Sequence, residues 1–347
     1  MDKLSKNTTL CGKLLKYIYI IYMKMNTNFF LFFNYVKMSS TWGQSAWFIK
    51  NFYKSSETTR SAFYSQNIFY SIFSKNTNLK DTFYKWFVGI IDGNGIFYFF
   101  KNKKGIWTFC FKVTQNKKNV RLLYHIKTMI EVGSVNITQN SIAEFLIQDS
   151  KIIIKYVLPI IDKYPLLTSK DFNYKKFREA ILISENISIS KKIKDNKITI
   201  IYNKVIPNNY VSSAWINITE ITIYNVNIII SKEWIIGFTE VNGSFYLVKK
   251  EQYEISHMFE IKQKQDKIIL DAISIILPIK VYNNKSYWIC ITTNKNDIYH
   301  IINYYKNTLK GIKSMEYRIW SRSFIKNLSF SELEIIGNKM KKISYTK

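Results

Sequence analysis

The sequence has few of the residues that build cross-linked or metal-clustered proteins. Its three cysteines, Cys11, Cys110 and Cys290, lie far apart and form no C-x-x-C pair, which excludes a disulfide framework and a cysteine-based zinc site. A reducing compartment fits this composition. The three histidines are also isolated and form no H-E-x-x-H zinc motif, and the sequence contains no phosphate-binding P-loop.

Long apolar runs are missing as well. The aromatic and apolar stretch from Leu14 to Val36 is interrupted by Lys16 and Lys24, and its longest charge-free run has 12 residues. A helix needs about 20 apolar residues to cross a bilayer, and the stretch lacks the small-residue cleavage site of a secretory signal. We therefore expect no membrane partner, and we assign no chemistry to the N-terminal extension, residues 1–80.

The sequence does contain a large excess of positive charge. Its formal net charge is +27, with 51 Lys and Arg residues against 24 Asp and Glu residues, and this balance favours a polyanionic partner such as nucleic acid. Only five of these cations are arginines. Lys, Asn, Ile, Phe and Tyr all have A/T-rich codons, so an A/T-rich genome, such as that of an organelle, is an alternative source of the lysines.

Length and apolar content predict two folded domains. A typical domain has roughly 100 to 200 residues, and this chain has 347. Hydrophobic residues make up 47% of it, which excludes a largely disordered protein.

The chain contains an internal repeat centred on two glycine motifs. Residues 86–97 read WFVGIIDGNGIF, and residues 234–245 read WIIGFTEVNGSF. An offset of 148 residues aligns Gly89 with Gly237, and it also aligns the tryptophans, the acids and the Asn-Gly pairs. A repeat of this kind predicts two copies of one structural unit.

The alignment continues beyond the motifs. Gln115 falls on Gln263, and each glutamine lies 26 residues after its motif glycine. Further along, the offset shrinks to 143, where Lys170 falls on Lys313. The second copy has therefore lost five residues from a loop.

The hydrophobic periodicity changes in the same order in both copies. After each motif, two alternating aromatic-rich runs predict a β-hairpin, and a segment with helical period follows. Two more short β-like runs and another helix complete each copy. The elements predicted in this order are 96–100, 108–113, 120–130, 133–137, 144–147 and 151–162 in the first copy, and 244–248, 257–261, 267–276, 279–282, 287–292 and 297–305 in the second.

These patterns predict an α+β fold of two αββαββα domains with mostly antiparallel strands. We expect the first domain at residues 81–185 and the second at 232–347. Residues 186–231 lack the motifs, are rich in Asn, Lys and Ile, and are predicted to connect the two domains.

The motif residues resemble the LAGLIDADG homing endonuclease and maturase family, over roughly residues 81–347. The segment from Lys163 to Lys170, KYPLLTSK, is similar to the family segment that follows the last helix of the first copy. The segment from Gly311 to Trp320, GIKSMEYRIW, is similar to its counterpart in the second copy, and SFYLV at 244–248 resembles the first strand of second copies in fungal mitochondrial intron proteins.

The resemblance implies a pseudo-symmetric architecture. The two motif helices pack at the domain interface, where Gly89 and Gly237 let the backbones approach because glycine has no Cβ. For either motif alone, the alternative is an ordinary buried helix that ends in an Asn-Gly cap. Each domain lays a saddle-shaped antiparallel sheet into the DNA major groove, which admits a β-ribbon. On these strands the resemblance places DNA-facing candidates Tyr98, Phe100, Lys112 and Thr114 in the first copy and Tyr246, Val248, Lys262 and Lys264 in the second. For any one of them, a core aromatic or a solvated lysine is the alternative.

The resemblance also implies Mg²⁺-dependent double-strand cleavage, with one acid from each motif helix just before the final glycine. Here these positions are Asn94 and Asn242. An amide oxygen carries no formal charge, so we expect metal affinity and cleavage to be weakened. Asp92 and Glu240 lie two residues earlier, about 200° away around the helix, and reach a metal only through a bound water.

The other catalytic positions of the family are retained. Lys170 and Lys313 match basic residues that lie near the attacking water and the phosphate, where an ammonium stabilises developing negative charge. Gln115 and Gln263 match a polar position that orders water. For these glutamines, the alternative is a strand end that faces solvent.

By resemblance, the chain is expected to bind a long double-stranded DNA site as a monomer and to reside in the mitochondrion. The alternative is an RNA maturase that assists splicing of its host intron, a role that does not require the two acids. A third possibility is an inactive intron relic, which should also carry defects in its core.

Overall fold

The computed structural model describes residues 79–138, 140–251 and 254–344. They belong to one compact unit, Thr77–Lys347. The predicted N-terminal extension therefore lies almost entirely outside the described residues. Among the described helices, none combines the length and the apolar character needed to span a bilayer.

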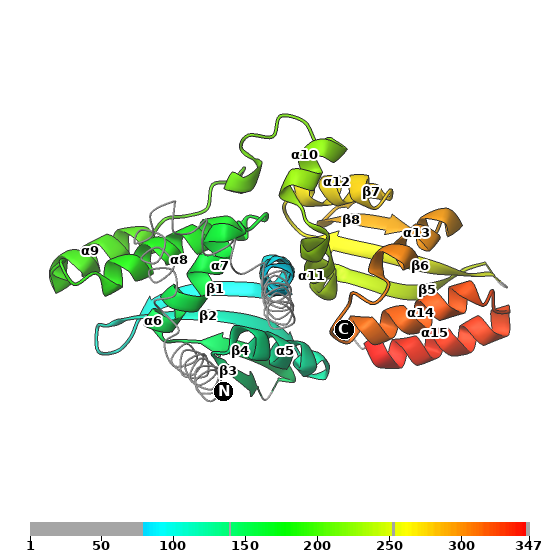
Figure 1. Ribbon diagram of the computed structural model, residues 1–347, viewed down its shortest axis with the longest axis horizontal. Coiled ribbons are helices and arrows are strands. Elements are labelled where there is room, and N and C mark those ends of the chain that lie inside the picture. Colours follow the sequence, from blue (N-terminus) through cyan, green and yellow to red (C-terminus); the bar gives the residue numbers. More distant parts are fainter. Residues whose placement is uncertain (1–78, 139, 252–253, 345–347) are drawn as a thin grey trace, which may run out of the picture. The chain divides into compact units, whose positions relative to one another are not determined.

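The first half forms a four-stranded antiparallel sheet that follows directly on the motif helix, residues 79–94 (Figure 1). The strands are ordered β1-β2-β4-β3, with bounds Gly95–Lys101 for β1, Trp107–Asn116 for β2, Ser134–Ile137 for β3 and Ile142–Ile147 for β4. Helix α5 (Val120–Ile130) packs against β2, β3 and β4. The segment after β4 is a helix in three parts, α6 (Ser150–Ile152), a π-helical turn (Ile153–Val157) and α7 (Leu158–Lys163).

The second half repeats this arrangement. Its motif helix α11 (Lys232–Asn242) leads into a sheet ordered β5-β6-β8-β7. The bounds are Gly243–Glu251 for β5, Glu254–Gln263 for β6, Lys280–Asn284 for β7 and Tyr287–Thr292 for β8. Helices α12 (Lys267–Ile276) and α13 (Lys295–Tyr305) pack on this sheet. The predicted pair of antiparallel sheets is confirmed.

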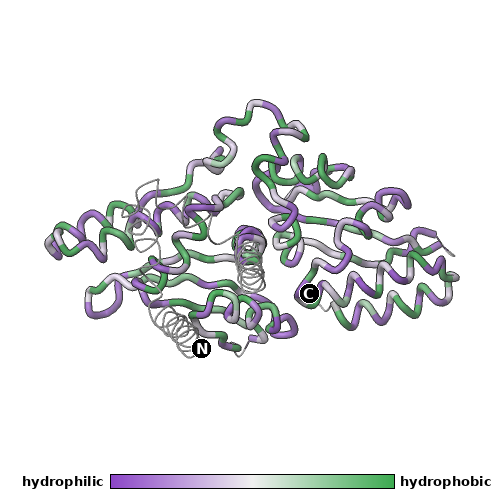
Figure 2. Tube along the Cα trace, viewed as in Figure 1, coloured by the Kyte–Doolittle hydropathy of each residue, from purple (hydrophilic) through white to green (hydrophobic). Residues whose placement is uncertain are grey.

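Each half continues through two helices that the periodicity did not predict. The first half adds α8 (Lys170–Glu185) and α9 (Lys191–Tyr202), and the second adds α14 (Lys313–Ile325) and α15 (Phe330–Ser344). Helix α8 buries Tyr174, Phe177 and Ala180, three residues apart, on one face. Each helix pair alternates apolar and polar residues along its length (Figure 2), as expected for helices that cover a sheet on one side.

Helix α9 corrects the boundary of the predicted connector. It packs on α8, and Asp195 in it accepts hydrogen bonds from Lys101 Nζ (2.8 Å) and Trp107 Nε1 (2.9 Å) at the β1–β2 hairpin. This helix therefore belongs to the first half. The remaining connector includes a 3₁₀ turn (Ser213–Trp215) and α10 (Ile223–Ile229), and Trp215 anchors it by donating to Leu167 O at 2.9 Å.

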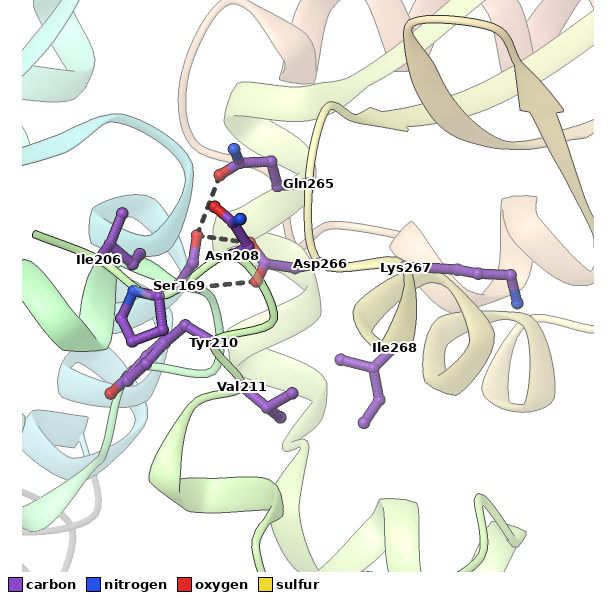
Figure 3. Close-up of a pocket in the computed structure, with 10 residues that line it drawn as sticks. Ser169, Ile206, Asn208, Tyr210, Val211, Gln265, Asp266, Lys267 and Ile268 are labelled. Carbon is purple, nitrogen blue, oxygen red and sulfur yellow. Dashed lines mark hydrogen bonds between the residues drawn. The ribbon is translucent and has the colours of Figure 1, made fainter.

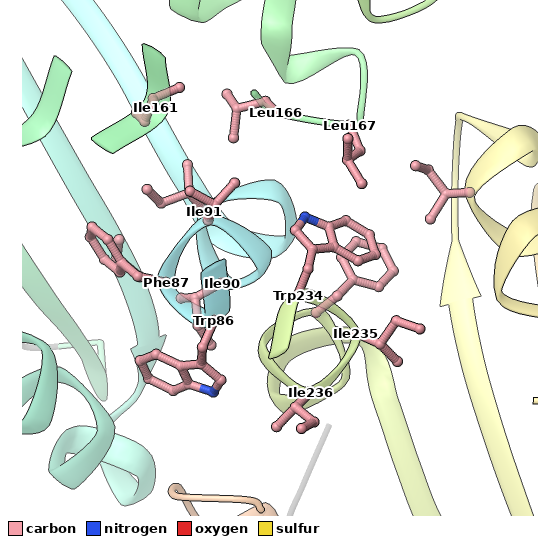
Figure 4. Close-up of a cluster of buried hydrophobic side chains, with 14 of the residues drawn as sticks. Trp86, Phe87, Ile90, Ile91, Ile161, Leu166, Leu167, Trp234, Ile235 and Ile236 are labelled. Atoms are coloured by element: carbon pink, nitrogen blue, oxygen red, sulfur yellow. The ribbon is translucent and has the colours of Figure 1, made fainter. Parts of the chain in front are cut away.

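The two motif helices lie in backbone contact at their glycines. A Cβ built on Gly89 would lie 2.2 Å from the carbonyl oxygen of Trp234, and a Cβ on Gly237 would lie 2.0 Å from that of Trp86. No other residue type fits at either position without separating the helices. Ile90, Ile91, Ile235 and Ile236 follow or precede these glycines and belong to one cluster of buried hydrophobic side chains that includes both halves (Figure 4).

Candidate active site and nucleic-acid interface

Lys170 lies against the C-terminal end of the first motif helix. It is the first residue of α8, and its ammonium donates to the carbonyl oxygens of Gly93 (2.6 Å) and Ile91 (3.3 Å). The last carbonyls of a helix carry partial negative charge, which favours a cation there. Burial nevertheless lowers the pKa of Lys170 to about 8, while Asp92 and Asp266 oppose the shift. A half-buried ammonium is thus held on the carbonyl oxygen of Gly93, the residue before Asn94.

Lys313 has a different surrounding. It begins α14 in the same way, but its ammonium forms an ion pair with Glu316 Oε2 at 3.1 Å. The side chain of Glu316 is 2% exposed and that of Lys313 15% exposed, so the pair is largely shielded from water. The two lysines that the repeat aligned are therefore equivalent in the fold but not in their electrostatic partners.

Asn94 and Asn242 are the last residues of their motif helices. Both are half-buried. The amide of Asn94 donates from Nδ2 to Thr114 O on β2 at 3.1 Å, which fixes the end of the helix on the sheet. Lys170 and Asn94 thus meet at the end of the first motif helix, where the family resemblance placed the catalytic centre.

Asp92 is a structural residue of the interface. Its carboxylate accepts hydrogen bonds from Leu167 N (3.0 Å), from Thr168 N (3.0 Å) and Oγ1 (2.6 Å), and from Trp234 Nε1 (2.8 Å) in the other half. Burial raises its pKa to about 6 in spite of these donors. Both oxygens of Asp92 thus accept hydrogen bonds from the protein, and its contact with a metal stays a prediction.

Glu240 does the same for the second half. Its Oε1 accepts from the backbone amides of Lys310 and Gly311, the latter at 3.1 Å. Burial raises its pKa. Oε2 is buried without a hydrogen-bond partner among the described atoms. The carboxylate faces the loop that precedes Lys313, so here too the acid holds the lysine-bearing loop, and its contact with a metal stays a prediction.

The two glutamines contact residues that the sequence did not single out. Gln115 Oε1 accepts from Asn119 Nδ2 at 2.9 Å, and Gln263 Nε2 donates to Asp266 Oδ2 at 3.4 Å. Gln115 Nε2 is buried and has no partner among the described atoms. Asn119 and Asp266 each reach into the opposite half of the molecule. In the sequence, the signal for Asn119 and Asp266 is that each is a polar residue directly before a predicted helix.

The residues present do not fit a two-carboxylate Mg²⁺ site. The described part of the chain contains no group of three or more His, Cys, Asp or Glu residues arranged around a possible metal. Asn94 and Asn242 offer only neutral amide oxygens, and Mg²⁺ gives up its water shell reluctantly except to carboxylates and phosphates.

The first sheet has one face on the core and one open face. Phe97, Phe99 and Phe111 are buried on the core face. The predicted DNA-facing residues Tyr98, Phe100, Lys112 and Thr114 share the opposite, open face, since the β1–β2 register pairs Ile96 with Lys112 and Tyr98 with Cys110. On that face Lys112 forms an ion pair with Glu144 of β4 at 2.8 Å.

The second sheet has the same division. Phe245 and Phe259 are buried, and Tyr246, Val248 and Lys262 alternate with them on the open face, while Lys264 follows the end of β6. A carboxylate is present here too. Glu260 accepts from Tyr246 Oη at 2.7 Å and pairs with Lys262 at 2.6 Å. Both sheets therefore carry a carboxylate that is paired with a lysine on the open side, and that of Glu260 is buried, with 5% of the residue exposed.

Comparison with known proteins agrees with this architecture. The sequence profile of a family described as LAGLIDADG endonuclease matches residues 87–181 and 235–324. The chain is 32% identical to a probable intron-encoded endonuclease, Cox1-I1b, of Schizosaccharomyces pombe, over 76% of this chain and 69% of that protein. It is 30% identical to an uncharacterized mitochondrial protein, RF1, of Saccharomyces cerevisiae, over 49% of this chain and 34% of that protein.

Solved structures show the same fold. The LAGLIDADG homing endonuclease I-SmaMI, bound to cleaved DNA, superposes with a TM-score of 0.65 at 24% identity, covering 76% of this chain and 98% of that one. The same protein bound to an uncleaved DNA target in the presence of calcium ions gives a TM-score of 0.62 at 23% identity, covering 75% and 97%.

Proposed function

Because the chain belongs to the LAGLIDADG endonuclease family, we propose that it binds an extended double-stranded DNA site as a pseudo-twofold monomer and cleaves it weakly or not at all. One observation carries the second half of this proposal. Both motif helices end in asparagine, and the only carboxylates of the two motifs, Asp92 and Glu240, are turned toward backbone amides.

DNA binding is supported by the two open sheet faces. Each presents a row of alternate side chains from two long strands, and a two-stranded ribbon of this kind fits the major groove. The high positive charge adds affinity for phosphates that does not depend on sequence.

Loss of cleavage is supported by the chemistry of the ligands. In this family, a divalent ion at the helix ends supplies an activated water and neutralises charge on the leaving oxygen. By family resemblance, Lys170 and Lys313 would stabilise charge on a phosphate, but an ammonium does not replace the metal in generating the nucleophile. The lysines then contribute to binding the DNA backbone.

The experiment begins with selection of a target. Duplexes that bind the purified protein are enriched from a randomised pool, and the selected duplex is incubated with Mg²⁺ or Mn²⁺ and either the natural protein or the Asn94→Asp, Asn242→Glu variant. We expect both proteins to bind the duplex and the variant to cut it faster. Cleavage by the natural protein at the variant's rate would refute the proposed loss, and failure to enrich any duplex would refute DNA binding.

A role in RNA splicing is the second candidate. Loss of both acid positions with the buried core retained is the pattern that selection for binding alone would leave. If no duplex is enriched but the protein binds the RNA of the intron that encodes it and speeds its splicing, this candidate replaces the first. We also propose mitochondrial residence, which the A/T-biased composition and the description of one relative as a mitochondrial protein support.

A further inference from the structure

Each lysine-bearing loop is held by a residue from the opposite half. Asp266, in the second half, accepts from the backbone amide of Ser169 through Oδ1 (2.9 Å) and from its hydroxyl through Oδ2 (3.0 Å). Ser169 directly precedes Lys170. Figure 3 shows this contact beside a pocket of about 410 Å³ that connector residues also line.

The reverse contact has the same form. Asn119, in the first half, accepts from the backbone amide of Ile312 through Oδ1 at 2.9 Å. Ile312 directly precedes Lys313. Asn119 and Asp266 are 147 residues apart, close to the repeat offset, and each lies just before the helix that follows the hairpin, α5 or α12.

Each of these residues also contacts the glutamine of its own half. The chain of contacts runs from Gln115 through Asn119 to the loop of Lys313, and from Gln263 through Asp266 to the loop of Lys170. Each candidate site therefore combines a lysine of one half with a glutamine of the other.

We propose that Asp266 and Asn119 are positioning residues that act across the two halves, Asp266 on Lys170 and Asn119 on Lys313. The proposal rests on the proposed function only in assigning these lysines to the DNA phosphates. Each lysine-bearing loop then has two points of attachment. Asp92 and Glu240 fix each loop to the motif helix of its own half, and the contact from the other half fixes the residue immediately before the lysine.

The second half uses an acid, Asp266, where the first half uses an amide, Asn119. The neighbours of the two residues explain this difference. A Cβ on Gly311 would lie 2.6 Å from Asn119 Oδ1 and 2.9 Å from Glu240 Oε2, so both oxygens lie on the same side of that glycine. A carboxylate at position 119 would face the carboxylate of Glu240. Asp266, in contrast, faces the Lys170 ammonium, whose charge it favours.

The test measures backbone amide hydrogen exchange and the rate of lysine acylation, resolved by residue, in the full-length protein. Asp266→Ala should speed exchange at the Ser169 amide by about tenfold, as expected for loss of one hydrogen bond, and should raise acylation of Lys170 while leaving Lys313 unchanged. Asn119→Ala should speed exchange at the Ile312 amide and raise acylation of Lys313, and it should leave Ser169 and Lys170 unchanged. The control is Asp271→Ala on α12, the helix that Asp266 precedes, because the carboxylate of Asp271 forms an ion pair with Lys267 at 2.6 Å.

Conservative variants separate positioning from general destabilisation. Asp266→Asn keeps the acceptor for Ser169 and should restore slow exchange there. Asn119→Asp should not restore it at Ile312, because the new carboxylate faces Glu240. The proposal is overturned if the Ala variants speed exchange uniformly over the chain, if Asp271→Ala has the same effect, or if the two conservative variants behave alike. None of these measurements uses DNA, so their outcome is independent of whether the protein binds or cuts it.

Discussion

Trp234 and Asp92 join the two halves by a hydrogen bond from the indole Nε1 to the carboxylate Oδ2, 2.8 Å long and fully buried. The equivalent residue of the first motif, Trp86, is also buried, but its Nε1 has no hydrogen-bond partner among the described atoms. The two aligned tryptophans thus occupy equivalent positions, but the hydrogen bond between the halves comes from Trp234.

This difference predicts unequal effects of one substitution. Trp234→Phe removes a donor from a buried carboxylate and should lower the free energy of unfolding by about 1–3 kcal/mol beyond the loss of ring volume. Trp86→Phe breaks no indole hydrogen bond among the described atoms and is the matched control. Urea unfolding of both variants measures the difference, and equal losses would contradict the assigned role of the hydrogen bond.

The glycines at the helix contact should tolerate no side chain. Gly89→Ala and Gly237→Ala place a Cβ against backbone atoms, which cannot move aside as a flexible side chain does, and each should cost about 3 kcal/mol or more. Gly337→Ala in α15 is the control, since its Cβ would lie 3.8 Å from the nearest atom. There alanine should stabilise the helix by about 1 kcal/mol. Thermal or urea unfolding distinguishes the two outcomes.

Lys170 should make stability and DNA affinity depend on pH. Burial lowers its pKa from 10.5 to about 8, so between these values the unfolded chain binds more protons than the folded one. The free energy of unfolding that this lysine contributes therefore rises from pH 8 to pH 10.5. Over the same range the folded lysine loses its charge, and affinity for DNA phosphates should fall.

A comparison of the natural protein with Lys170→Met at pH 7 and pH 9 isolates this lysine. We expect DNA affinity to fall more between these values in the natural protein than in the variant. Identical pH profiles would show that Lys170 is not near the phosphates or does not titrate in this range.

The open sheet faces should determine the salt dependence of DNA binding. Lys264→Ala is expected to reduce the slope of log affinity against log salt by about 0.9, as for one lost phosphate contact. Lys341→Ala, on α15, is the control and should leave the slope unchanged. The same slope in the natural protein, Lys264→Ala and Lys341→Ala would argue against a DNA contact at the end of β6.

The sequence alone was sufficient to identify the repeat and the two sheets, but not the open face of each sheet. Residues 97–100 are all aromatic, so the sequence does not show which of them are buried. The structure buries Phe97 and Phe99, and alternate residues of the strand face opposite sides of the sheet. Helices α8 and α14 were not predicted, although Tyr174, Phe177 and Ala180 recur at helical spacing. Charged residues between them weaken the apolar signal that periodicity depends on.

Where the acids point was decided only by the tertiary structure. Asp92 and Glu240 follow the motif glycines in the sequence like candidate ligands, but their partners are amides of loops about 70 or more residues away in the chain. The contacts of Asp266 with Ser169 and of Asn119 with Ile312 join different halves. Local patterns fix which residues share a helix or a strand face, whereas hydrogen bonds between distant segments depend on tertiary folding, and those between the halves also require docking through Gly89 and Gly237.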